Sequence, residues 1–393
     1  MLRSIALLAC FSSVAAHGAL ISPPSRNALD RFLPGFQGGA SKSDSCNCGS
    51  NSGCEEGVRA SGGGQPCLWF SQGCTIGCDE CTGLGSHTAQ RLCNGTMQPT
   101  LPKYAWTMNR WASEGSVNDS YRYNPWRAPG AAPVFDACGK AGGTYPKNFG
   151  PGVAVFANTT FAKGGDLGSV ALPPAPSGTI WTAGSEAEVA WGIRYNHGGG
   201  YQYRLCPASE ALSEACFQRT PLPFVRDKQE LQFLNGTRLS IPGTFVDVGT
   251  SPAGSTWAMN PIPRIDFDSS GSGQPAAFHG CVAGPGGEPH DAPGAARGRG
   301  CRQFDPPCSW DDGWFAQPPR RASVDVEGAC SGDWTGGTIV DKVTVPKDLK
   351  PGHYVLGWRW DCEETSQIWA SCADVTVIAP QAAVAPASTT VEQ

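Results

Sequence analysis

The chain has 393 residues, of which only 16% are charged, and it carries a net charge of −5 together with 51 glycines and 33 prolines. This composition disfavours long helices and coiled coils, and it favours short strands joined by turns and ordered loops. The net charge gives no sign of a nucleic-acid groove or of an anionic membrane surface as partner. Beyond the first 16 residues, no apolar stretch of about 18 residues predicts a membrane span.

Residues 1–16 have the pattern of a cleavable secretion signal. An early arginine precedes a short apolar run, and small residues close the segment. Cleavage after Ala16 would make His17 the first residue, so that its amine and its imidazole form a short chelate suited to Cu(II). Cleavage after Ala15 is an alternative, and it would leave Ala16 in front of His17. We expect a secreted, extracellular protein.

Eighteen cysteines indicate an oxidising compartment. One lies in the signal segment, so 18 − 1 = 17 remain, and eight of them fall within residues 46–93. The spacings there would also allow zinc, but exported cysteine-rich loops usually form disulfides. We therefore expect a disulfide-linked loop region with little secondary structure and one cysteine that is unpaired or bonded to another molecule. Four glycosylation sequons support export: Asn94, Asn118, Asn158 and Asn235.

Alternating apolar and polar residues predict a series of short strands. In chain order, the expected strands are 185–193, 201–205, 338–345, 352–360 and 373–378. Gly/Pro-rich turns between them favour an all-β sandwich. We expect one domain over 17–378 that contains an irregular insert at about 265–325. Residues 379–393 read as a disordered tail.

A copper ion needs more ligands than one terminal histidine can provide. His197 is the best second candidate, because it lies on a turn of three glycines that can expose an imidazole. A turn histidine bonded to a local carbonyl is the simpler alternative when His197 is considered alone. Four other histidines rank lower, as loop or strand residues: His87, His279, His290 and His353.

Three sets of motifs then resemble one protein family. They are His17–Gly18 with SPPSR at 22–26, NHGG at 196–199 with YQYRLCP at 201–207, and YVLGWRW at 354–360 with CADV at 372–375. In this order they resemble chitin-binding type-4 domains, the lytic polysaccharide monooxygenases, and most closely the animal and algal branch active on chitin and cellulose. The resemblance covers about 17–378 and implies an immunoglobulin- or fibronectin-like β-sandwich.

The resemblance also implies a copper site and an oxidative activity. His17 would supply an amine and a ring nitrogen to one copper ion, and His197 a third nitrogen. With O2 or H2O2 and an external electron donor, such a site removes hydrogen beside a glycosidic bond of insoluble chitin or cellulose. We expect a monomer, with neither nucleic acid nor membrane as partner.

Two residues near this site depart from the family pattern. Trp369 stands where Phe or Tyr usually packs beside the copper, and Tyr195 stands where a small Ala is common. Gln367 and Glu364 are candidates for hydrogen bonds around the ligands. The departures keep two alternatives open: a non-catalytic chitin- or cellulose-binding wall protein, and an extracellular copper carrier.

Overall fold

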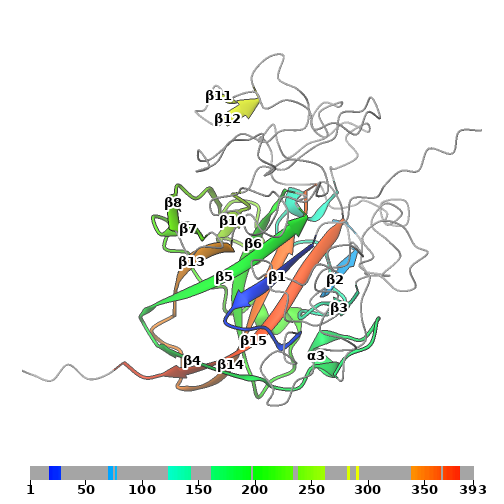
Figure 1. The fold of residues 1–393 in the computed structure, drawn as a ribbon, viewed down its shortest axis with the longest axis vertical. Helices are drawn as coiled ribbons and strands as arrows, with labels where there is room; N and C mark the ends of the chain where they lie inside the picture. Colours follow the sequence, from blue (N-terminus) through cyan, green and yellow to red (C-terminus); the bar gives the residue numbers. More distant parts are fainter. Residues whose placement is uncertain are drawn as a thin grey trace, which may run out of the picture.

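The computed structural model describes residues 17–27, 70–73, 76–77, 123–142, 161–195, 198–232, 238–261, 281–283, 289–291, 338–363 and 366–380. They form a β-sandwich of two sheets (Figure 1). The five-stranded sheet contains, in spatial order, β1 (His17–Ser22), β5 (Glu186–Tyr195), β13 (Thr338–Thr344), β7 (Gln229–Gln232) and β8 (Arg238–Ile241). The predicted fold class, an all-β sandwich, is confirmed.

The eight-stranded sheet lies against the first. Its order is β3 (Lys140–Ala141), β2 (Phe70–Gly73), β15 (Gln367–Ile378), β14 (Gly352–Asp361), β6 (Gly200–Pro207), β10 (Trp257–Met259) and β9 (Phe245–Val246), and β4 (Pro176–Thr182) pairs in parallel with β15. A separate antiparallel pair joins β11 (Cys281–Ala283) and β12 (Pro289–Asp291). The helical segments are η5 (Pro125–Arg127), α3 (Gly168–Ala171) and α4 (Glu214–Phe217), and none in the described ranges is long and apolar enough to cross a membrane.

Four of the five expected strands correspond closely to β5, β6, β13 and β14. The fifth was placed wrongly at its start, because β15 begins at Gln367 rather than at residue 373. Residues 367–369 pair with both β14 and β2, which extends the strand beyond the alternating stretch. The other strands within the described ranges were not expected, and β2 and the β11–β12 pair lie in regions expected to be irregular.

Several sequence-based expectations lie outside the described residues. These are the signal segment 1–16, most of the cysteine-rich region, the four sequons and most of the tail. Two disulfides are described, Cys138–Cys372 and Cys206–Cys216. Both attach covering segments to the outer face of the eight-stranded sheet, one through the 123–142 loop and one through α4.

Aromatic side chains fill the space between the two sheets. The Trp191 ring of β5 lies 5.1 Å from Trp358, 5.2 Å from Trp360 and 4.8 Å from Tyr201, and all four residues are fully buried. Such tilted aromatic pairs add to the stabilisation from apolar burial. The sandwich is therefore packed most heavily where β5 faces β14 and β6.

One acidic side chain lies inside this packed layer. Asp341 of β13 is 1% exposed, and it accepts hydrogen bonds from the hydroxyls of Tyr201 (2.9 Å) and Tyr203 (3.1 Å) and from the Gln229 amide (3.0 Å). Burial raises the pKa of Asp341 to about 6, although the three donors oppose the shift. A carboxylate thus holds the two sheets together through tyrosines of the opposite sheet.

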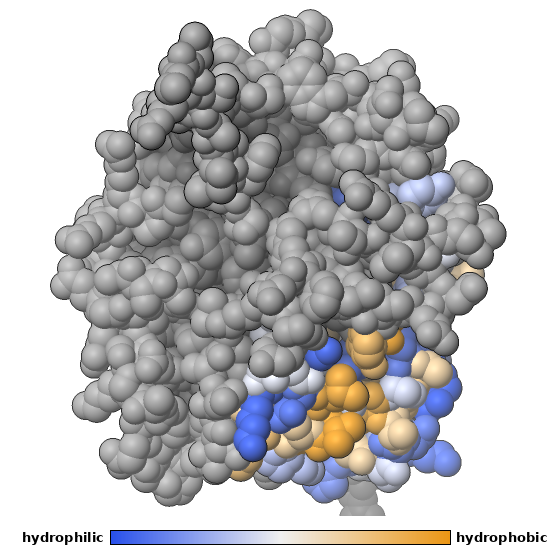
Figure 2. Space-filling model, turned by 90° about the vertical axis from the view of Figure 1, so that its right-hand side faces the viewer, coloured by the Kyte–Doolittle hydropathy of each residue, from blue (hydrophilic) through white to orange (hydrophobic). Residues whose placement is uncertain are grey.

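The outer surfaces differ in polarity. The outer face of the five-stranded sheet carries ion pairs, among them Arg238–Glu188 at 2.9 Å. Figure 2 shows a hydrophobic patch among hydrophilic residues on another face. Ile180 of β4 (63% exposed) and Ile378 of β15 (38%) are among the exposed apolar side chains, and Ile378 lies at the opposite end of β15 from Gln367.

The buried Asp341 predicts an unusual dependence of stability on pH. Because its native pKa of about 6 exceeds its ordinary 3.8, the folded protein retains a proton between these values that the unfolded chain has lost. We expect the free energy of unfolding to decrease as pH rises from about 4 to 6, by on the order of 3 kcal/mol. Urea unfolding of Asp341→Asn should lack this component. Asp348→Asn, at an exposed turn, is the control and should keep it; parallel profiles for the wild type and Asp341→Asn would contradict the assignment.

Candidate metal centre

The strand pairing brings the two candidate ligand segments together. β1 begins at His17, β5 ends at Tyr195, and these two residues are register partners, with a shift in register immediately after them. His197 follows Tyr195 by two residues and lies outside the described residues, as does the side chain of His17. In the chain, His197 is therefore two residues beyond the register partner of His17.

The two residues that follow His197, Gly198 and Gly199, are held in place by hydrogen bonds to their backbone carbonyls. The Gly198 carbonyl accepts a hydrogen bond from the Trp360 indole N–H at 2.8 Å, and the Gly199 carbonyl accepts one from the Asn260 N–H at 2.8 Å. Gly199 has a φ of +81°, and a Cβ there would lie 2.0 Å from the Asp361 carbonyl oxygen. Only glycine fits this position, because both the dihedral angle and the available space exclude a side chain.

The segment that follows His17 is anchored to the opposite sheet. A Cβ on Gly18 would lie 3.0 Å from Cε3 and Cζ3 of Trp360, so the backbone here lies directly against the indole. Further along β1, the Leu20 N–H lies 3.4 Å from Ser371 Oγ of β15. The guanidinium of Arg26, just beyond β1, binds both carboxylate oxygens of Asp374, at 2.7 and 2.6 Å. Contacts to the eight-stranded sheet thus fix the direction of β1 along its length.

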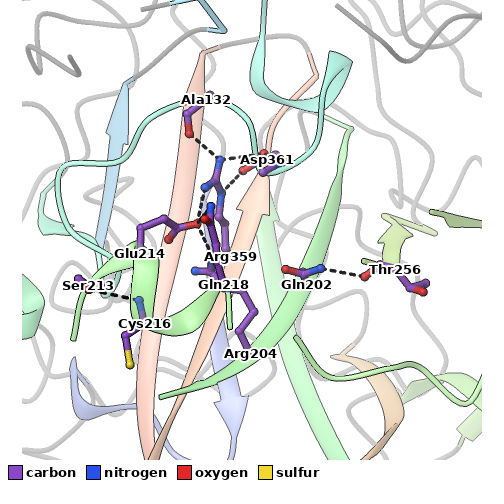
Figure 3. A network of polar contacts seen from close by, with 11 residues as sticks. Ala132, Gln202, Arg204, Ser213, Glu214, Cys216, Gln218, Thr256, Arg359 and Asp361 are labelled. Atoms are coloured by element: carbon purple, nitrogen blue, oxygen red, sulfur yellow. Dashed lines mark hydrogen bonds and ion pairs between the residues drawn. The ribbon is translucent and has the colours of Figure 1, made fainter. Parts of the chain in front are cut away.

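Charged side chains stabilise the end of β14 from the other side of the sheet (Figure 3). Arg359 binds both carboxylate oxygens of Asp361, at 2.6 and 3.0 Å, and donates to Glu214 at 2.8 Å, while Arg204 also pairs with Glu214. Asp361 accepts a further bond from the Gly130 N–H at 2.8 Å. All these groups are buried or nearly so, and the two cations balance the two anions.

For Arg359 and Glu214, the ionic pairing outweighs the cost of burial. Desolvation acts to lower the pKa of Arg359, but Asp361 and Glu214 raise it above its ordinary value. Desolvation likewise acts to raise the pKa of Glu214, but Arg204 and Arg359 lower it. Burial nevertheless lowers the pKa of Arg204, although Glu214 and Asp361 oppose the shift. The last residues of β14 are held by ionic contacts on one face and by aromatic packing on the other.

The other predicted site residues lie at this same end of the sandwich or outside the described residues. Trp369 is fully buried on β15, with Trp360 as its register partner, and Gln367 is buried at the start of that strand. The Gln367 carbonyl accepts a hydrogen bond from the Cys362 N–H at 3.1 Å. Tyr195 is described only in its backbone, and Glu364 lies outside the described residues.

Sequence reasoning missed the residues that position these segments. Trp360 and Asp361 are consecutive in β14, so their side chains point to opposite faces. The WRW stretch at 358–360 was expected in a strand, but its alternation of aromatic and charged residues predicts a strand with one exposed face. In the structure Arg359 and Asp361 are buried as well. Trp126 is fully buried, and its ring atoms lie 2.3 Å from a Cβ built on Gly200, so its side chain serves packing.

The described residues do not themselves contain a complete metal site. No group of three or more His, Cys, Asp and Glu side chains within the described ranges is arranged to hold an ion. His353 is exposed on β14, 3.2 Å from the Thr376 hydroxyl. It lies eight residues from Asp361, about 26 Å along the strand. The pair predicted from the sequence, His17 and His197, stays the candidate centre.

No protein-family profile matches the chain. Among solved structures, it is similar to a lytic polysaccharide monooxygenase from Thermobia domestica in the Cu(I) state, with 12% identity, 92% of this chain and 99% of that chain covered, and a TM-score of 0.29. It is also similar to a copper complex of a cellulose-active lytic polysaccharide monooxygenase (12% identity, 93% and 100% covered, TM-score 0.29) and to a chitin-binding domain from Burkholderia pseudomallei (11%, 92% and 100%, TM-score 0.27). Because these identities and TM-scores are low, the functional assignment depends on this chain's own residues.

Proposed function

We propose that this chain is a secreted copper protein that cleaves chitin or cellulose oxidatively, as a lytic polysaccharide monooxygenase does. The observation that supports the proposal is the register pairing of His17 with Tyr195, a residue that precedes His197 by two positions in the chain. After cleavage at Ala16, this junction would present one amine and two imidazoles. Three nitrogen donors of this kind fit Cu(II) in tetragonal geometry.

The protein's own residues would hold the ion and limit access to it. His17 binds through its amine and one ring nitrogen, and His197 through one ring nitrogen. When bound, copper supplies the redox chemistry that activates O2 or H2O2 with electrons from an external donor. Trp369 offers copper no ligand atom, since indole has only a donor N–H, so it contributes packing. Gln367 and Glu364 are the proposed hydrogen-bonding groups around the ligands. Tyr195 is the residue proposed to restrict the access of oxygen to the copper ion.

The position of the site suits an insoluble substrate. The junction lies where β1 begins and β5 ends, at an end of the sandwich. A polymer in a crystal cannot enter a pocket, so the reacting group has to be held rigidly at a surface. The tightly fixed ends of β14 and of the glycine turn provide such a support.

The first prediction concerns the N-terminus of the secreted protein. Expression in a eukaryotic secretion host should yield a chain that begins at His17, because small residues precede it in the pattern of a signal cleavage site. Mass analysis of the N-terminal peptide measures this directly. A chain that begins at Ala16 would lack the amine–imidazole chelate and would contradict the proposed copper site.

The second prediction concerns the copper ligands. Titration of Cu(II) into His197→Ala should show an affinity loss larger than the roughly 10–100-fold typical of losing an outer-shell partner. His353→Ala is the matched control, because it removes a distant imidazole, and it should bind like the wild type. Affinity should also fall on acidification, since imidazole and amine must be deprotonated to bind. Equal affinity of the two variants would rule out His197 as a ligand.

The third prediction separates catalysis from binding. Copper-loaded protein incubated with chitin or cellulose and ascorbate should release oxidised oligosaccharides, detectable by mass spectrometry, and His197→Ala should release none. Binding to either polysaccharide without oxidised products would favour the non-catalytic wall protein. Tight copper binding with no affinity for polysaccharide would favour the copper carrier.

A further inference from the structure

The side chain of Trp360 touches both segments that carry the candidate ligands. It is fully buried on the inner face of β14. Its six-membered ring lies against Gly18, the residue after His17, and its N–H donates to the carbonyl of Gly198, the residue after His197. One rigid ring system thus lies between two backbone segments that are far apart in sequence.

We infer that Trp360 is a positioning residue that sets the spacing between the His17 and His197 segments. The inference rests on the proposed function, since it concerns the same copper site. Tryptophan suits this role because its indole is large, flat and rigid and carries a donor at one edge only. The opposite, apolar edge can then lie directly against a glycine backbone.

The next residue strengthens the same contact from the other face of the sheet. The carbonyl of Asp361 lies against Gly199, and its carboxylate is held by Arg359 and by the Gly130 N–H. The Trp360 backbone therefore cannot move away from the turn without disturbing a buried ionic network. The ionic network on the outer face thus holds the Trp360 backbone in place, and the indole can fix the positions of Gly18 and Gly198.

Trp358 provides a matched control within the same strand. It is equally buried, faces the same layer and lies 5.1 Å from Trp191, where Trp360 lies 5.2 Å. Its register partner on β6 is Tyr203, whereas the partner of Trp360 is Tyr201, so Trp358 lies two residues further from the glycine turn. Within the described part of the chain, its indole N–H has no hydrogen-bond partner. Replacement by Phe therefore exchanges an indole for a smaller phenyl ring at both positions, but it removes a hydrogen bond to the turn only at Trp360.

The experiment compares Trp360→Phe with Trp358→Phe in the secreted protein. In the metal-free state, hydrogen–deuterium exchange of peptides covering 17–20 and 196–200 should increase in Trp360→Phe and stay near wild type in Trp358→Phe. Cu(II) affinity should fall about 10–100-fold in Trp360→Phe alone, as for loss of other outer-shell partners. The Cu(II) electron paramagnetic resonance spectrum should change in that variant as well, because the ligand geometry changes.

The outcomes distinguish the positioning role of Trp360 from the copper assignment itself. Equal exchange and equal spectra in both variants would overturn the role of Trp360 even if the wild type binds copper. A selective increase in exchange, with no copper binding by the wild type, would support the positioning role and overturn the copper assignment.

A second variant covers the case in which Trp360→Phe does not fold. Gly18→Ala places a methyl group 3.0 Å from the indole, so β1 has to shift away from it. This variant should lower copper affinity and increase exchange over residues 17–20. Unchanged affinity and exchange would overturn the inference.

Discussion

Contact between one buried indole and two glycine backbones determines the local arrangement at the candidate site. Gly18 and Gly198 are 198 − 18 = 180 residues apart. Gly18 lies directly against the Trp360 ring because it has no side chain, and Gly198 contacts the indole N–H through its carbonyl. The β1–β5 register alone would align the two segments side by side, but it would not fix their distance from the opposite sheet. The indole fixes this distance, because Trp360 belongs to the opposite sheet of the sandwich.

The position of Trp360 depends in turn on the burial of β14 on both faces. On the inner face, the ring packs against Trp191, and on the outer face Arg359 and Asp361 form an ion pair under the 123–142 loop. Removing one partner of a buried ion pair leaves an uncompensated charge, so the outer face resists rearrangement more than apolar packing alone would. The disulfide between Cys138 and Cys372 connects the same covering loop to β15. Rigidity at the candidate site is therefore a property of the whole strand end.

Local pattern was sufficient to predict the sandwich and most of its central strands, because alternation reports which face of a strand is buried. It was not sufficient for the start of β15, where pairing with two neighbours extends the strand through a stretch without alternation. His17 and His197 could be singled out from their unusual positions in the chain. Trp360 could not, since its role depends on a contact between sheets. Asp341 shares its strand face with Ile339 and Val343, so its burial was readable, but its tyrosine partners come from the opposite sheet.

A ligand at a chain terminus, as we propose for His17 after cleavage at Ala16, poses a particular physical problem. A terminal residue is covalently connected on one side only, and ordering it costs conformational entropy that a metal ion would have to offset. Here, contacts that form without the ion offset part of this entropic cost. Gly18 contacts Trp360, Leu20 contacts Ser371, and the buried Arg26 pairs with Asp374. The Asp374 carboxylate also accepts a hydrogen bond from the Ala175 N–H. All of these partners except Ala175 belong to β14 or β15. The geometry available to a His17 ligand is therefore set by the opposite sheet, which ties the proposed metal chemistry to the integrity of the sandwich core.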